Sequence, residues 1–245
     1  MTTPPDQALQ QQLLAHVASF QTSWGYWRQH ARLRWQRLAW RRFLGGPAFA
    51  KRMLDVIGSA CALLLLSPLF LLIMIAIRVE DGRPAIFVQT RVGRFGRLFK
   101  MYKFRSMHHD AEKRLKELLA TNHHNHGVTF KIKDDPRITR VGKWLRKFSF
   151  DELPQFFNVL VGDMSLVGPR PPVPREVALY SLSDRRRLAV APGITCIWQI
   201  SGRAEIDFPG QVKLDVRYIE TQSLWQDIKI LLKTIPAVAS GSGAY

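Results

Sequence analysis

Two adjacent acidic residues, Asp151 and Glu152, lie in a strongly basic part of the chain and are its main candidates for chemistry. A carboxylate can attack a phosphorus atom, and a neighbouring carboxylate can hold a divalent cation that neutralises pyrophosphate oxygens. Arginines bind the remaining phosphate oxygens in a bidentate manner. The basic residues around the pair are Arg137, Arg140, Lys143, Arg146, Lys147 and Arg170. Together with the two acids they indicate phosphoryl transfer.

The same two acids also fit a structural role at a helix start. Ser149 and Glu152 have the spacing of a capping box, in which the serine is the N-cap. Pro154 would then lie beyond the first turn, where its missing backbone N–H is needed. A helix that begins at Asp151 keeps Pro154 in the first turn and places both acids at a positive helix terminus. The residues alone leave catalysis and capping both open.

Other catalytic and metal-binding signatures are missing from the sequence. It contains no GxxxxGK[ST] phosphate-binding loop, no GxSxG elbow, no HExxH helix and no dinucleotide-binding glycine fingerprint. Cys61 and Cys196 lack metal-ligand spacing, and Cys61 lies in an apolar run, so we expect no disulfide. His123, His124 and His126 have no further ligands near them in sequence, so they predict a loop rather than a metal site.

The charge of the chain requires an anionic partner. Lys and Arg number 36 against 19 Asp and Glu, which gives a formal net charge of +17. Nucleic acid, phospholipid head groups and a phosphorylated substrate would each satisfy such an excess. Charge alone does not choose among them.

An uncharged apolar run at 56–77 is long enough to cross a bilayer as a helix. A buried core helix is the alternative, although soluble cores seldom need so long an apolar surface on every face. Ser67 and Pro68 interrupt the run, and proline removes a backbone donor. Basic residues flank both ends: Arg41, Arg42, Lys51 and Arg52 before it, and Arg78, Arg83, Arg91 and Arg94 after it. Because such flanks stay cytoplasmic, we predict a re-entrant helix–break–helix rather than a span.

Residues 1–50 combine basic and aromatic side chains. Apolar residues recur there at helical spacing, and arginines surround Trp35 and Trp40. This pattern predicts an amphipathic helix at an anionic membrane surface, with a packing helix or a dimerisation arm as the alternative. We predict no nucleic-acid binding, because no base-reading motif accompanies the basic residues.

The part that follows the apolar run alternates short elements with loops rich in Gly and Pro. Strands at 85–89 and 98–104 are predicted to form a small β-hairpin. Helices are predicted at 110–119, 141–148, 152–160, 173–180, 208–221 and 224–239, with loops at 162–174 and 192–203. The sequence thus predicts an α+β fold that is mostly α. It has three parts: the N-terminal extension (1–50), the re-entrant membrane helix (51–80) and a cytoplasmic domain with membrane-surface helices (81–245).

Blocks of sequence between residues 50 and 240 resemble, in the same order, bacterial polyprenyl-phosphate phosphoglycosyl transferases of the small monotopic class. The blocks are KRMLD (51–55), the Ser67-Pro68 pair, FVQTRVG (87–93), FKMYKFRSM (99–107), DDPRITRVGKWLRKFSFDELPQFFNVLVGDMSLVGPRP (134–171), PGITCIWQISGR (192–203) and LDVRYIE (214–220). The block PVPREVALY (172–180) and the arginine-rich segment after it are most similar to hexose-1-phosphate transferases of exopolysaccharide pathways.

The resemblance implies a ping-pong reaction at the acid pair. Asp151 would be the nucleophile that forms a covalent phospho-sugar intermediate. Glu152, with Asp151, would bind Mg²⁺. The family breaks its membrane helix at the position that matches Ser67-Pro68.

Basic residues are assigned by the same resemblance. Arg146, Arg170 and Arg203 match positions whose side chains contact substrate phosphates. Lys103 and Arg105 are further candidates, either for substrate phosphates or for lipid head groups. Asp215 and Tyr218 fit a structural role and a substrate-facing one equally well.

The partners also follow from the resemblance. The donor would be UDP-glucose or UDP-galactose and the acceptor undecaprenyl phosphate, with release of UMP in the first membrane step of exopolysaccharide biosynthesis. The protein would lie at the bacterial inner membrane with its catalytic domain on the cytoplasmic face. A donor with an N-acetylated sugar, a non-catalytic lipid- or nucleic-acid-binding protein and a scaffold with a decayed site are the rival functions. The oligomeric state, a homodimer included, stays open.

Overall fold

The computed structural model of the protein describes residues 46–82, 84–108, 111, 135–202 and 205–240. The chain divides into two compact units, Met1–Ala50 and Lys51–Tyr245, and the elements that support the site belong to the second. The predictions for residues 1–45, for nearly all of the helix at 110–119, for the three histidines and for Arg203 lie outside the described residues.

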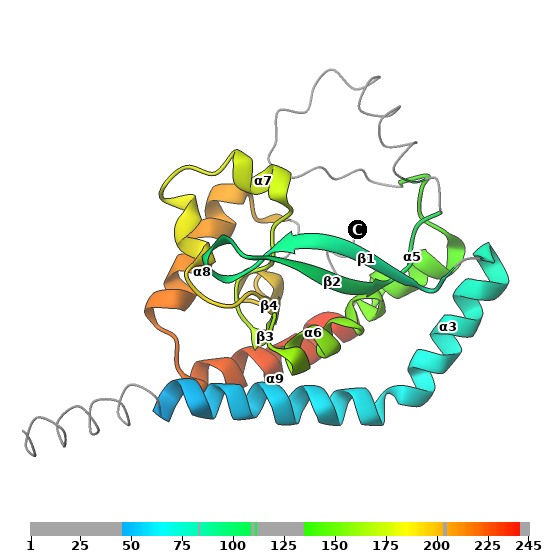
Figure 1. The fold of residues 1–245 in the computed structure, drawn as a ribbon, viewed down its shortest axis with the longest axis horizontal. Coiled ribbons are helices and arrows are strands. Elements are labelled where there is room, and N and C mark those ends of the chain that lie inside the picture. Colours follow the sequence, from blue (N-terminus) through cyan, green and yellow to red (C-terminus); the bar gives the residue numbers. More distant parts are fainter. Residues whose placement is uncertain (1–45, 83, 109–110, 112–134, 203–204, 241–245) are drawn as a thin grey trace, which may run out of the picture. The chain divides into compact units, whose positions relative to one another are not determined.

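Helices make up most of the described chain, and two small sheets complete it (Figure 1). The α-helices are Gly46–Leu65, α3 (Ser67–Asp81), α5 (Arg140–Lys147), α6 (Gln155–Val161), α7 (Pro174–Ala178), α8 (Phe208–Glu220) and α9 (Leu224–Ser240). Strands β1 (Ile86–Val92) and β2 (Leu98–Phe104) form an antiparallel hairpin, and β3 (Ser165–Val167) and β4 (Gly193–Thr195) form a parallel pair. The predicted α+β class with a small β-hairpin is confirmed.

A bend of 60° separates the helix Gly46–Leu65 from α3, and the break is at Leu66, directly before the predicted pair Ser67-Pro68. Pro68 has no N–H to donate to the carbonyl of Leu64, four residues earlier. The Ser67 hydroxyl donates to that carbonyl oxygen instead, at 2.8 Å. Pro68 itself lies in the first turn of α3, where a missing donor is tolerated. The serine and the proline together therefore bend the chain without leaving the Leu64 carbonyl unpaired.

By length and composition, no single helix in the described ranges qualifies as a membrane span, whereas Gly46–Leu65 and α3 qualify when taken as a bent pair. Large apolar side chains are exposed along both arms: Met53, Ile57, Leu64, Leu65, Leu71, Leu72, Ile75 and Val79. A bent pair of this kind fits a broken span as well as a re-entrant helix, and the re-entrant arrangement stays a prediction.

Polar contacts attach the long helix to the elements that follow it. The ammonium of Lys51 lies 2.7 Å from a carboxylate oxygen of Asp227 in α9. Arg52 donates hydrogen bonds of 2.7 and 2.8 Å to two carbonyls in the last turn of α6, where helix carbonyls favour a cation. Asp55, which is buried, accepts from a backbone N–H of β3 at 2.9 Å. In the sequence, Lys51 and Arg52 count as positive charges that flank the apolar run. In the structure, both side chains form hydrogen bonds or ion pairs within the protein.

The hairpin presents polar side chains toward one side. Since residues two apart share a face of a strand, Gln89 and Arg91 of β1 lie on the face to which Lys103 of β2 also belongs. Asn158 in α6 is completely buried and holds the hairpin in place. Its Oδ1 accepts from a backbone N–H of β2 at 3.0 Å, and its Nδ2 donates to a β2 carbonyl at 2.7 Å.

The parallel strands β3 and β4 lie in segments for which the sequence predicts only loops, and that prediction is wrong. Each strand has three residues, too few to show the alternation that identifies a strand. Their connecting backbones touch at two glycines. A β-carbon on Gly193 would lie 2.1 Å from the backbone nitrogen of Gly168, so only glycine fits there. This contact brings the segment after β3 beside the start of β4.

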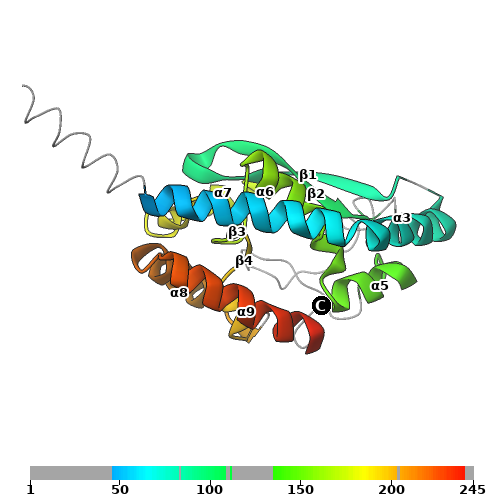
Figure 2. The same cartoon turned by 90° about the horizontal axis from the view of Figure 1, so that it is seen from below.

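Two apolar clusters support the site. Phe99, Met101, Val159, Met164, Leu166, Val167, Tyr218 and Ile230 join the hairpin to α6, β3, α8 and α9. Ile73, Ile77, Ala85, Phe104 and Leu145 join α3 to β2 and α5, and Phe150 and Leu153 pack against them. Figure 2 shows α9 running beside the long helix, with its C-terminal end toward α5. The second cluster holds the acid pair in place, because Phe150 and Leu153 flank it on both sides.

Candidate active site

The acid pair lies in a 3₁₀ turn, Phe150–Glu152, between α5 and α6. Ser149 precedes the turn with φ 55° and ψ 22°, in the left-handed region in which helices commonly end. Its N–H donates back to the Arg146 carbonyl at 3.1 Å. Ser149 therefore terminates α5, and its hydroxyl caps no N–H of the described chain. The capping-box alternative is wrong.

The helix start proposed at Asp151 is also wrong, because α6 begins at Gln155. Pro154 occupies the N-cap of α6, where the missing N–H leaves no helix carbonyl unpaired. Asp151 and Glu152 therefore lie in a separate turn ahead of α6. The left-handed residue at 149 directs the chain from α5 into this turn.

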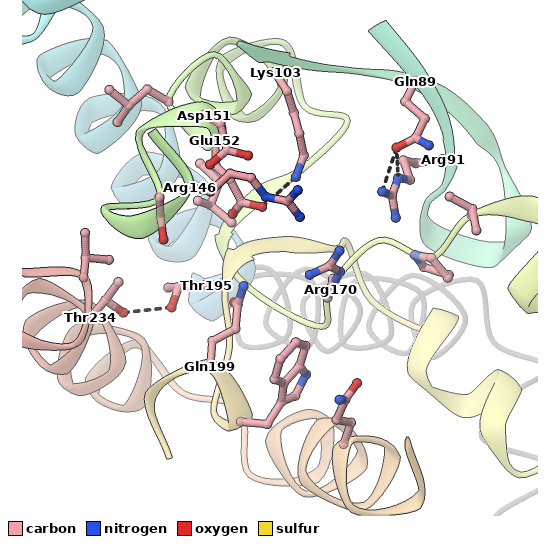
Figure 3. Close-up of a pocket in the computed structure, with 18 of the residues that line it drawn as sticks. Gln89, Arg91, Lys103, Arg146, Asp151, Glu152, Arg170, Thr195, Gln199 and Thr234 are labelled. Carbon is pink, nitrogen blue, oxygen red and sulfur yellow. Dashed lines mark hydrogen bonds and ion pairs between the residues drawn. The ribbon is translucent and has the colours of Figure 1, made fainter. Parts of the chain in front are cut away.

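A cavity of about 480 Å³ opens beside the acid pair, a size typical of small-molecule sites. Its charged lining consists of Arg91, Lys103, Arg146, Asp151, Glu152, Arg170, Arg175, Glu176 and Arg187. Figure 3 shows the side chains of Lys103, Arg146 and Arg170 converging on the two acids. The geometry therefore brings together the two catalytic candidates and three of the basic residues assigned to phosphate binding.

Lys103 contacts the second acid directly. Its ammonium lies 2.7 Å from Oε1 of Glu152, and the two side chains are 15% and 21% exposed. The ion pair thus joins β2 to the turn and is largely shielded from water. Opposite charges attract more strongly there than in bulk water. The resemblance made Lys103 only a further candidate for binding phosphates or lipid head groups. In the structure it forms an ion pair with Glu152.

The two carboxyl groups have opposite pKa shifts. Burial raises the pKa of Asp151 to about 6, with the charge of Glu152 acting in the same direction and that of Lys103 against it. Burial would raise the pKa of Glu152 as well, but the charges of Lys103 and Arg170 hold it below its usual range. At neutral pH both groups are ionised, and Asp151 is the more basic of the two. A buried carboxylate with a raised pKa is typical of a functional site.

The remaining basic candidates have different positions. Arg170, in the segment after β3, and Arg146, in the last turn of α5, both line the cavity. Arg105 is not among the described residues that line it: its Nε donates to the Pro84 carbonyl at 2.9 Å, and its guanidinium lies 5.9 Å from the ring centre of Phe87. The structure therefore separates Arg105 from the acid pair.

Arg91 lines the cavity. In the sequence analysis it counted only as one of the positive charges that follow the apolar run. Its Nε and Nη2 donate to Oε1 of Gln89 at 3.0 and 2.7 Å, and its Nη1 donates to the Pro171 carbonyl at 2.8 Å. Burial lowers its pKa to about 10, and the charge of Arg170 acts in the same direction. Arg91 thus connects the hairpin to the segment that carries Arg170. The only sequence signal was its place in the FVQTRVG block.

The rest of the lining has mixed chemistry. Rings and polar groups come from Tyr180, Arg187, Trp198, Gln199, Phe208 and Gln211. Apolar side chains come from Phe148, Phe150, Phe156, Ile194, Ala237 and Val238. Phe148, Phe150, Ala237 and Val238 are together called the apolar wall.

Asp215 and Tyr218, for which the sequence left two roles open, lie behind this lining rather than in it. The Arg187 guanidinium donates to the Asp215 carboxylate, which is buried. The Tyr218 hydroxyl donates to Asp227 at 2.7 Å and accepts from the Lys51 ammonium at 3.3 Å. Asp215 therefore positions a lining residue, and Tyr218 has a structural role in the core.

The residues present fit a Mg²⁺ ion. Asp151 and Glu152 supply two carboxylates at a cavity that is large enough for a substrate, and Mg²⁺ is commonly held by one or two carboxylates together with substrate phosphates. Within the described ranges there is no cluster of three or more potential ligands that would hold a metal by protein groups alone. The donor set therefore suits a cation that binds with a phosphorylated substrate.

Comparison with known proteins finds relatives that match most of this chain. The profile described as "Bacterial sugar transferase" matches residues 47–241. The chain is 55% identical over 196 residues to "Galactosyl transferase CpsE" of Streptococcus agalactiae serotype III (strain NEM316), covering 80% of this chain and 43% of that protein. It is 46% identical over 200 residues to "Undecaprenyl-phosphate galactose phosphotransferase" of Salmonella typhimurium (strain LT2), covering 80% and 42%.

A third relative matches over nearly its whole length. The chain is 43% identical over 207 residues to "Exopolysaccharide production protein ExoY" of Rhizobium meliloti (strain 1021), covering 83% of this chain and 91% of that protein. The chain spans less than half the length of the first two relatives. With the profile over residues 47–241 and this near-complete relative, the chain belongs to the bacterial sugar transferase family.

Proposed function

We propose that the protein transfers a hexose 1-phosphate from UDP-galactose or UDP-glucose to undecaprenyl phosphate, with release of UMP. The observation that carries this proposal is the half-buried acid pair at a cavity on which Lys103, Arg146 and Arg170 converge. The name of the Salmonella relative supports the acceptor, and the name of ExoY supports a part in exopolysaccharide production. We place the reaction at the first membrane step of that biosynthesis.

In the first half-reaction, Asp151 is the nucleophile. An Oδ atom of Asp151 forms a bond to the phosphorus that bears the sugar, and the bond from that phosphorus to the bridging oxygen of the diphosphate breaks. UMP leaves with the bonding electron pair, and the sugar phosphate remains on the carboxylate. With a pKa of about 6, Asp151 is ionised at neutral pH and needs no separate base. Lys103, Arg146 and Arg170 stabilise the charge that develops on the phosphate oxygens.

In the second half-reaction, a phosphate oxygen of undecaprenyl phosphate attacks the same phosphorus. The bond from phosphorus to the Asp151 oxygen breaks, so the carboxylate is regenerated. The product is an undecaprenyl diphospho-sugar. Both half-reactions use one set of cations, because the same phosphorus is attacked in each.

Mg²⁺ is the proposed cofactor, with Glu152 and Asp151 as its protein ligands. When bound, it supplies positive charge that offsets the diphosphate oxygens. The Lys103 ammonium keeps Glu152 ionised and oriented toward the cavity, so that the carboxylate is ready to accept a cation.

The proposed location is the bacterial inner membrane, with the catalytic unit on the cytoplasmic face. The bend at Ser67-Pro68 and the exposed apolar side chains on both arms support a re-entrant helix. Labelling of single cysteines placed at the exposed positions 48 and 84 tests this arrangement. Both are expected to react from the cytoplasmic side, and reaction from opposite sides would establish a span instead.

Release of UMP tests the proposed reaction. The purified full chain is incubated with Mg²⁺, undecaprenyl phosphate and a panel of UDP-sugars that includes UDP-galactose, UDP-glucose and an N-acetylated donor. Lipid-dependent UMP release with a hexose donor, abolished in Asp151→Asn, is the expected result. Binding of lipid without UMP release from any donor would refute the transferase in favour of a non-catalytic binding protein.

A further inference from the structure

The apolar wall of the cavity has no role in the first half-reaction. A UDP-sugar is polar over nearly its whole surface and gains little from an apolar contact. The Thr234 hydroxyl on this wall bonds to Thr195 at 2.8 Å and donates to the Ile230 carbonyl at 2.7 Å, so its polar atom is already paired. The wall therefore offers carbon atoms to a ligand, and an apolar ligand is the one that it stabilises.

On one side, the wall continues to the protein surface through three aromatic rings. Phe148 and Phe150 line the cavity, with ring centres 5.8 Å apart. Trp144 on α5 packs edge-on against both, at 5.0 and 5.9 Å, and is 58% exposed. This cluster forms a continuous apolar surface from the acid pair to the outside of α5.

On the other side, the wall continues over α9. Ala237 and Val238 line the cavity. Leu232 and Ile235 are 61% and 68% exposed. Because residues three apart are neighbours on a helix surface, Ile235 lies beside Val238. The C-terminal turns of α9 thus join the cavity to an exposed apolar face, on the side where α9 points toward α5 (Figure 2).

Two cations lie close to the same surface. Arg146 lines the cavity beside the acid pair. The Lys147 ammonium lies 5.4 Å from the ring centre of Phe148. A ligand that matches both features has an anionic head near Arg146 and an apolar chain along the rings. A cavity of about 480 Å³ cannot enclose a long prenyl chain, so the rest of such a chain must leave through the opening.

We propose that the opening between the Trp144–Phe148–Phe150 cluster and the C-terminal turns of α9 is the entry portal for the acceptor, a long-chain isoprenyl phosphate. Its phosphate reaches Asp151 past Arg146, and its first isoprene units lie on the apolar wall. The donor contacts the rings and polar groups of the same cavity, so donor and acceptor use different residues of the lining. This proposal rests on the proposed function, since it names the route of the acceptor in that reaction.

Photolabelling tests the portal without using activity as the readout. The wild-type chain in nanodiscs is irradiated with a benzophenone-bearing prenyl phosphate, and the labelled peptides are identified by mass spectrometry. Label on α5 and on the last turns of α9, displaced by undecaprenyl phosphate but not by phosphatidylglycerol, is expected. Label elsewhere, or equal displacement by phosphatidylglycerol, would overturn the portal. Absence of UMP release in the same preparation would count against the proposed function alone.

A matched pair of variants then separates the two half-reactions. Ala237→Trp fills the apolar wall, whereas Ala178→Trp adds the same ring at an exposed position of α7, away from the proposed portal. Ala237→Trp is expected to keep the burst of UMP that donor alone gives, and to lower kcat/KM for undecaprenyl phosphate by about tenfold or more. Ala178→Trp is expected to change neither. Equal effects of the two variants, or loss of the burst in Ala237→Trp with its fold intact by circular dichroism, would contradict the portal.

Discussion

The Lys103 ammonium lies 2.7 Å from Oε1 of Glu152, so a cation of the hairpin is bound to the second residue of the acid pair. The sequence assigned Lys103 to substrate phosphates or to lipid head groups. Its place beside Glu152 gives it a further effect, because its charge lowers the pKa of both acids. The reactivity of Asp151 is therefore set partly by a residue in β2.

Removal of this cation should shift the acid limb of the pH profile. Burial raises the pKa of Asp151 to about 6 and Lys103 opposes that rise, so Lys103→Met moves the pKa further upward. Only the ionised carboxylate attacks phosphorus, so activity is lost as pH falls through this pKa. The acid limb of kcat/KM for the donor, near pH 6 in the wild type, should move to higher pH in Lys103→Met.

Two controls accompany this measurement. Lys103→Arg keeps the charge and should leave the limb near its wild-type position. Lys100→Met removes a lysine from the opposite face of β2 and should not move it either. A limb that stays in place in Lys103→Met, or that moves to lower pH, would show that Lys103 does not influence the nucleophile.

The left-handed backbone at Ser149 makes a contrasting pair of substitutions informative. At φ 55°, a β-carbon costs of the order of 1 kcal/mol, so Ser149→Gly should leave the free energy of unfolding unchanged or raise it slightly. Ser149→Val should lower it and reduce turnover, since a β-branched residue resists this conformation. Ser183 has φ −66° at an exposed site, and Ser183→Gly should destabilise by about 0.5 to 1 kcal/mol. If chemical denaturation shows equal changes in the free energy of unfolding for Ser149→Gly and Ser183→Gly, the backbone at Ser149 is not strained.

The contact between the long helix and α9 should contribute strongly to stability. Lys51 and Asp227 are 19% and 1% exposed, so Lys51→Met leaves a buried carboxylate without its cation and should lower the free energy of unfolding by about 3 kcal/mol. The double variant with Asp227→Asn should recover part of the loss, because asparagine is neutral. Lys229 is an exposed lysine of α9, the helix that carries Asp227, and Lys229→Met should change the free energy of unfolding by less than about 0.5 kcal/mol. Similar losses for the two single variants would refute the special role of Lys51.

The bend between the helix Gly46–Leu65 and α3 depends on a hydroxyl as well as on a proline. Ser67→Ala removes the donor that pairs with the Leu64 carbonyl, and Pro68 cannot replace it. We expect a loss of about 1 kcal/mol in nanodiscs, where lipid offers the carbonyl no partner. Ser67→Thr retains the hydroxyl and should behave as the wild type. A neutral Ser67→Ala in thermal unfolding would mean that water reaches the bend.

Local patterns predict a large part of the fold. The helix predicted at 224–239 is α9, and the strand predicted at 98–104 is β2, because both segments carry the periodicity of their elements over many residues. The strands β3 and β4 have three residues each and depend on the close approach of Gly168 to Gly193. That approach is a tertiary contact, which no local pattern reports.

The candidate site is harder to predict from the sequence than the fold. The acids at 151 and 152 stand out because of their basic surroundings, but their spacing from Ser149 equally suits a capping box. The left-handed conformation that excludes the box follows from the packing of Phe150 and Leu153. Arg91 and the apolar wall come from segments far apart in the chain, so only the fold brings them to the acids.

The central claim is the covalent intermediate on Asp151, and mass spectrometry of the quenched enzyme tests it most directly. The full chain is mixed with Mg²⁺ and UDP-galactose in the absence of acceptor, quenched and digested. We predict one hexose phosphate on the peptide that contains Asp151, a matching burst of UMP, loss of the adduct when undecaprenyl phosphate is added, and no adduct in Asp151→Asn. Product formation by a wild-type enzyme that shows no adduct and no burst, or an adduct on another residue, would contradict the account.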